Sequence, residues 1–142
     1  MVVGVDGSAS SAHTLEIAFQ EAAARGTTLT AIAAYELTMV WSGYGVGPQA
    51  FDVAEIEAAE RKQLDDAVAP WREKYPSVHV ETLVARGTAA EALIGVSQTA
   101  ELVVVGTRGH GGFAGLLLGS VGQQLLHYAH SPVLIARPAA SH

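Results

Sequence analysis

The sequence predicts an α/β fold: a single domain over residues 1–142, with one open five-stranded parallel sheet and four helices on both faces. Five short apolar runs alternate with four segments of helical periodicity. This alternation is typical of parallel strands joined by right-handed crossovers. The last two runs, Leu102–Val105 and Pro132–Ala136, are apolar on both faces. Strands covered by helices on both sides require such a pattern.

The first strand, helix and second strand are predicted from the amino-terminal quarter. Met1–Val5 is a β-branched run that ends at the turn signal Asp6-Gly7-Ser8. Ser11–Arg25 carries apolar residues at helical spacing, and Gly26 stands where a helix usually ends. Thr28–Tyr35 is the expected second strand.

Residues 37–51 are rich in glycine and are expected to form a loop. Asp52 is expected to open a long helix, since Glu55 follows at nearly capping-box spacing, and Pro76 is expected to end it. Its acidic residues indicate a solvated face. Its apolar residues share the other face: Ile56, Leu64, Val68 and Trp71.

The second half continues the alternation. Val78–Val84 is the expected third strand, and Thr88–Glu91 is a capping box that opens a helix through about Gln98. Leu102–Val105 is the fourth strand. Ser120–Gln123 is another capping box, and the last strand, Pro132–Ala136, follows its helix. One apolar face is expected on that last helix: Val121, Leu125, Tyr128 and Ala129.

Composition excludes several classes of function. The chain is 49% hydrophobic and 15% charged, with a net charge of -6 and a pI near 5.4. Without a basic stripe it is a poor ligand for nucleic acid or an anionic membrane surface. It has no cysteine, so thiol catalysis, disulfides and cysteine-held metals are excluded. The start resembles no signal peptide and no apolar run would span a bilayer, so a cytoplasmic protein is expected.

A ligand is expected at the carboxyl ends of the strands. For strand order 3-2-1-4-5, the order reverses between the first and fourth strands, and binding crevices of open parallel sheets lie at such reversals. The turn Asp6-Gly7-Ser8 would then face the glycine-rich stretch that begins at Gly106. Gly119 and Ser120 open the last helix, whose free N–H groups favour an anion without any lysine.

The pattern Gly-x2-Gly-x9-Gly-Ser fits Gly106, Gly109, Gly119 and Ser120. With VVGVDGS at the front and SPVLIARP near the end, nearly the whole chain resembles the universal stress protein family, in its ATP-binding branch. The resemblance implies an adenine nucleotide alpha hydrolase-like fold that binds ATP, with Mg²⁺ or Mn²⁺ carried by the triphosphate. The sequence offers no carboxylate cage, so phosphate oxygens and water would hold that metal.

The resemblance also implies which residues bind ATP. Asp6 would contact base or ribose, and Ala34 would help to wall the adenine. The adenosine end would meet residues at three strand ends: Gly4, Val5, Asp6, Ala34, Val105 and Gly106. The phosphates would meet the glycine-rich stretch and the start of the last helix: Arg108, Gly109, His110, Gly119, Ser120 and Val121.

Simpler interpretations stand beside these. Ser120 could be only a helix N-cap, and Asp6 only an Asx-turn residue. Arg108 could be solvated and His110 an ordinary loop histidine. No catalytic residue is assigned, because only Asp6, Arg108 and His110 are plausible for hydrolysis and none is a strong base.

The functional hypothesis is therefore an ATP-binding regulator of the stress response that signals to an unidentified protein partner. A slow ATPase and a nucleotide-free dimeric scaffold are the alternatives. Strand Pro132–Ala136 would lie at an edge of the sheet, where an exposed apolar strand risks aggregation. The resemblance implies that this strand pairs antiparallel with a second copy, so a homodimer is expected.

Overall fold

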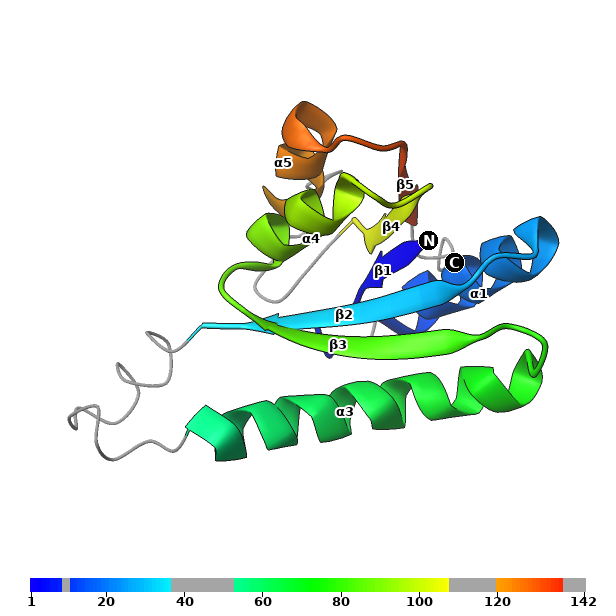
Figure 1. The fold of residues 1–142 in the computed structure, drawn as a ribbon, viewed down its shortest axis with the longest axis horizontal. Coiled ribbons are helices and arrows are strands. Elements are labelled where there is room, and N and C mark those ends of the chain that lie inside the picture. The colour runs from blue at the N-terminus through cyan, green and yellow to red at the C-terminus, as the bar shows by residue number, and fades with distance from the viewer. Residues whose placement is uncertain (9–10, 37–52, 108–119, 137–142) are drawn as a thin grey trace, which may run out of the picture.

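The computed structural model describes residues 1–8, 11–36, 53–107 and 120–136 (Figure 1). Asp52, expected to open the long helix, and the expected 37–51 loop lie outside these ranges. The described elements follow in chain order: β1 (Val2–Gly4), α1 (Ser11–Arg25), β2 (Leu29–Tyr35), α3 (Val53–Lys74), β3 (Val80–Arg86), α4 (Ala89–Ser97), β4 (Val103–Gly106), α5 (Ser120–Tyr128) and β5 (Val133–Ala136).

All five strands are parallel and lie in the order β3-β2-β1-β4-β5, which confirms the predicted topology. The order reverses between β1 and β4, where Val2 pairs with Val103 and Val3 with Val104. β3 and β5 are the two edges. The carboxyl ends of β1 and β4 therefore lie side by side, as the ligand hypothesis requires.

Helices cover both faces of the sheet, also as predicted. α1 and α3 bury one face around Phe19, Leu64 and Val68, none of them more than 2% exposed. The Phe19 ring lies against Trp71 and Tyr75, with centroids 6.4 and 5.9 Å apart. α4 and α5 bury the other face. Burial of apolar surface on both sides is the main stabilising term of such a fold.

Local signals position several helix ends. The Thr88 hydroxyl accepts a hydrogen bond from the Glu91 amide at 3.1 Å, so it caps α4 as predicted. Gly26 follows α1 with φ of 64°, a left-handed conformation that favours glycine. α3 ends at Lys74, two residues before Pro76.

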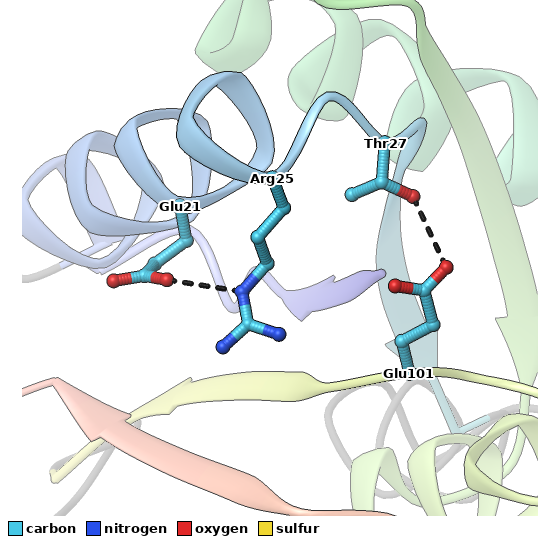
Figure 2. A network of polar contacts seen from close by, with 4 residues as sticks. All are labelled: Glu21, Arg25, Thr27 and Glu101. Atoms are coloured by element: carbon cyan, nitrogen blue, oxygen red, sulfur yellow. Dashed lines mark hydrogen bonds and ion pairs between the residues drawn. The ribbon is translucent and has the colours of Figure 1, made fainter.

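Two exposed polar contacts lie near the amino end of the sheet. Figure 2 shows Arg25 donating to Glu21 at 3.2 Å within α1, and the Thr27 hydroxyl donating to Glu101 at 3.4 Å. The second contact joins the turn before β2 to the turn before β4. Exposed contacts of this kind contribute little, about 0–1 kcal/mol each.

Two details of the sequence prediction are wrong. The third strand was expected at Val78–Val84 but runs from Val80 to Arg86. The Val78 amide donates to the Tyr75 carbonyl at 3.1 Å, so Val78 belongs to the turn after α3 and buries its side chain from there.

Tyr128 was expected on the apolar face of α5 but is 64% exposed. Leu125 is buried, with the partly buried Val121 and Ala129 packed against the same cluster. These residues are spaced four apart. Tyr128 is the last residue of α5, and its ring lies beside that of His127, with centroids 6.2 Å apart.

No helix in the described part of the chain is both long and apolar enough to cross a lipid bilayer.

Candidate functional site

The carboxyl ends of β1, β2 and β4 bring together the residues expected at the adenosine end. The Val5 amide donates to the Ile32 carbonyl at 2.9 Å, which places Asp6 beside the end of β2. Ala34 is the penultimate residue of β2. Gly106 ends β4, and Gly4 ends β1 in the adjacent position. The residues predicted to bind the adenosine end thus lie together at the carboxyl ends of the strands.

A cleft of about 50 Å³ opens at this edge on the side of α1 and α3. Pockets for drug-sized ligands measure about 300 Å³ or more, so this cleft by itself is too small to enclose such a ligand. Its walls come from the β1 turn, the end of β2 and the middle of α3: Val5, Asp6, Gly7, Ala33, Ala34, Glu60, Gln63, Leu64 and Ala67.

Gly4 and Val105 lie against the α4 and α5 layer, on the side of the sheet opposite to the cleft. A Cβ at Gly4 would lie 2.9 Å from the Leu93 Cδ1 atom of α4, closer than real Cβ contacts. The absence of a side chain at Gly4 thus lets α4 pack closely against β1. Val105 is 4% exposed in the same layer. Neither residue lines the cleft.

Asp6 is held by two serines. Its Oδ1 atom accepts hydrogen bonds from the Ser8 amide at 2.9 Å, the Ser8 hydroxyl at 2.6 Å and the Ser11 hydroxyl at 2.7 Å. The Asx turn of the simpler interpretation is therefore present. These bonds fix the carboxylate at the cleft, so a turn role and a ligand contact are compatible. Sequence reasoning did not single out Ser8 and Ser11, although an Asp-x-Ser spacing at a helix start is a usable signal.

Of the residues expected at the phosphates, Arg108, Gly109, His110 and Gly119 lie outside the described residues. Ser120 begins α5, and its side chain is also outside the description, so its capping role stays a prediction. Val121 is half-buried against the α4 and α5 layer. Just after β4, the buried Thr107 donates its backbone amide hydrogen to the Ala136 carbonyl at 3.2 Å.

α3 contributes more side chains to the carboxyl end of the sheet than the sequence indicated. The Tyr35 hydroxyl donates to Glu57 Oε1 at 2.7 Å and so joins the end of β2 to α3. This hydrogen bond, more than burial, raises the pKa of Tyr35, and Arg86 opposes the rise. The acidic residues of α3 were interpreted as a solvated face. That interpretation is incomplete, because Glu57 holds Tyr35 and Glu60 lines the cleft.

Within the described ranges, no three acidic or histidine side chains gather where they could hold a metal ion. These residues do not fit a metal held by the protein alone.

A family model described as the universal stress protein family matches residues 1–137. The chain belongs to the universal stress protein family. Universal stress protein Rv2623 of Mycobacterium tuberculosis is 41% identical over 138 residues, which cover 96% of this chain and 44% of that protein. The chain therefore spans less than half the length of this curated relative.

Solved structures of the family share the fold. A universal stress protein in complex with cAMP is 27% identical, with a TM-score of 0.71 and coverage of 94% of this chain and 93% of that one. The universal stress protein from Archaeoglobus fulgidus in complex with dAMP is 22% identical, with a TM-score of 0.67 and coverage of 94% of each chain. At 22% identity the second likeness concerns the fold alone.

Proposed function

We propose that this chain binds an adenine nucleotide, ATP by the glycine pattern, at the carboxyl edge of its sheet. The observation that carries the proposal is the cleft beside Asp6, between the end of β2 and α3; it adjoins β1, the strand at which the strand order reverses. Support comes from the family: one related protein was solved with cAMP and one with dAMP.

The chemistry of the cleft favours the nucleoside end. Small apolar side chains, Ala33, Ala34 and Ala67, leave room for a flat ring. Among its described lining residues there is no Lys, Arg or His, and Asp6 and Glu60 bring two carboxylates. A phosphate there would meet like charge. The phosphates belong instead near the start of α5, where free backbone N–H groups and the helix dipole favour anions.

The proposal extends to the physiological setting that the sequence predicts. A cytoplasmic, homodimeric regulator of the stress response would change its partner contacts with nucleotide occupancy. Mg²⁺ or Mn²⁺, if it accompanies ATP, would be held by phosphate oxygens and water. β5, apolar and only half-buried at its edge, supports pairing with a second copy.

Calorimetric titration with ATP tests the binding. We expect saturable binding with a Kd below about 1 mM, and an Asp6→Ala variant weakened about tenfold or more by the loss of a fixed acceptor. Asp66→Ala is the matched control, since Asp66 is an exposed carboxylate paired with Lys62 outside the cleft. Circular dichroism checks that both variants fold.

Absence of saturable binding would favour the nucleotide-free scaffold instead. Phosphate release from bound ATP over hours would favour the slow ATPase.

A further inference from the structure

We infer that α3 reads the nucleobase, with Glu60 and Gln63 selecting a purine that carries an amino group at position 6. This inference rests on the proposed function and deepens it. It names two residues that the resemblance did not, on an element that the sequence assigned to packing and solvent.

The two side chains share one face of α3. Residues three and four apart are neighbours on a helix surface, and Glu60, Gln63, Leu64 and Ala67 have that spacing. All four line the cleft. Leu64 is 2% exposed and packs into the core below, which fixes how α3 is rotated. Glu60, half-buried, and Gln63, exposed, thereby line the cleft beside the ends of β1 and β2.

Contacts at both sides of this stretch hold α3 on the sheet. Glu57, one turn before Glu60, accepts the Tyr35 hydroxyl at 2.7 Å. Arg72 donates to the Val80 carbonyl at 3.0 Å near the other end of the helix. The polar pair thus stands on a rigid element, and specificity requires such preorganisation.

Glu60 supplies an acceptor that has no competing partner in the described part of the chain. Asp6 is occupied by Ser8 and Ser11 through Oδ1. Glu60 is half-buried, and no hydrogen bond or ion pair joins it to another of the described residues. An ionised carboxylate only accepts hydrogen bonds, so it favours an N–H donor in the facing ligand. The 6-amino group of adenine is such a donor.

Gln63 complements the carboxylate. Its amide both donates and accepts, and glutamine pairs with the amino group and adjacent ring nitrogen of adenine. Hypoxanthine differs from adenine by an oxygen in place of the 6-amino group and by a proton on N1. That oxygen is an acceptor and would face the Glu60 carboxylate without a proton between them. Sites built around a hydrogen bond reject analogues that cannot form it.

The experiment compares AMP with IMP by calorimetry in EDTA, so that no divalent cation can bridge ligand and carboxylate. We expect the unmodified protein to bind AMP about tenfold or more tightly than IMP. In Glu60→Ala the preference should fall to within about threefold, because the acceptor and the repulsion both disappear. Gln63→Ala should weaken AMP binding with a smaller loss of preference.

Glu73→Ala is the matched control. Glu73 is an exposed carboxylate on the same helix, about 20 Å along the axis from Glu60 at 1.5 Å per residue. It changes the net charge equally and should leave the preference unchanged. Glu60→Gln is a second variant that retains an acceptor, and an intermediate preference is expected of it.

Equal binding of AMP and IMP, or a tenfold preference that survives Glu60→Ala, would overturn this inference and leave adenine nucleotide binding intact. ATP binding without measurable binding of either monophosphate would overturn it too, because recognition would then depend on the additional phosphates. Failure of ATP, AMP and IMP alike to bind would remove the proposed function, and this inference with it.

Discussion

The two outer strands of the sheet, β3 and β5, differ in how their outward-facing backbone groups are covered. β3 is seven residues long and β5 four, and each has a neighbour on only one side among the described strands. Along β3, Arg72 donates to the Val80 carbonyl at 3.0 Å and Arg61 to the Thr82 carbonyl at 3.4 Å. Because the His79 carbonyl accepts from β2, alternate carbonyls from Val80 onward point outward, and the arginines of α3 cover two of them.

β5 has no such cover among the described residues. Pro132 and Ala136 direct their carbonyls to β4, so Val133 and Ile135 present theirs outward. The side chains of Val133, Leu134 and Ile135 are only half-buried. An apolar strand with an open edge is a template for pairing with another strand.

The difference indicates where association can occur. Charged side chains on an edge strand are a common defence against unwanted pairing, and α3 supplies them to β3 from the neighbouring layer. Among the described residues nothing covers the outward backbone groups of β5, and its side chains are apolar. The comparison therefore supports the proposal of a homodimer through β5, and predicts that β3 takes no part in it.

The largest expected effect comes from Ile135→Pro. The amide of Ile135 points away from β4, so proline removes no hydrogen bond of the sheet itself. In a two-fold dimer the change occurs twice and removes about two interchain hydrogen bonds, or roughly 2 kcal/mol. Dimerisation should weaken about thirtyfold or more. Sedimentation velocity at tens of micromolar measures the change.

Val84→Pro provides the matched control on β3, where the backbone of residue 84 also points outward. It should leave the sedimentation coefficient unchanged. Dissociation by Val84→Pro but not by Ile135→Pro would reverse the roles of the two edges, and a monomer before any substitution would remove the homodimer proposal.

Much of this edge arrangement could be predicted from sequence. Alternating strands and helices fix a parallel sheet with few allowed topologies, so order 3-2-1-4-5 and the edge position of Pro132–Ala136 were predictable. The bounds of β3 were not. Val78 is as apolar as a strand residue, and only the turn made by Tyr75 excludes it from the strand.

The candidate site was predictable only in part. Strand ends are located by turn signals, which indicated that Asp6 and Gly106 end neighbouring strands, whereas Ala34 was implied only by the family resemblance. The spacing of apolar residues shows which face of a helix is buried. It does not show which strand end lies next to the residues that border that face. Glu60 was therefore interpreted as part of a solvated face until α3 was placed on the sheet.

The double variant Arg61→Ala/Arg72→Ala tests whether these two arginines protect the outward-facing carbonyls of β3. Two charge-assisted hydrogen bonds are lost, but the freed carbonyls reach water. The free energy of unfolding should fall by about 1–2 kcal/mol in urea titrations, with Arg72→Ala the larger single effect because its bond is shorter and part-buried. The uncovered edge should also raise the sedimentation coefficient at high concentration.

Arg25→Ala controls for loss of an arginine without exposure of a strand edge. Its exposed ion pair with Glu21 predicts a change of about 0.5 kcal/mol or less and no new association. Equal stability losses in Arg25→Ala and in the double variant would show that the arginines on β3 act only as ordinary surface charges.

The smallest expected effect concerns the side chain of Thr82, which lies on β3 between the two carbonyls that the arginines contact. The Thr82 hydroxyl donates to Asp65 Oδ1 at 2.9 Å and lies 3.5 Å from Arg61 Nη1. Thr82→Val keeps a β-branched shape and should cost about 0.5 kcal/mol or less, because the contact is exposed. A double-mutant cycle with Asp65→Ala measures the coupling, expected at about 0.3–0.5 kcal/mol. A coupling of zero would mean that Asp65 does not help to hold the edge, and that the protection of β3 rests on arginine contacts to the backbone alone.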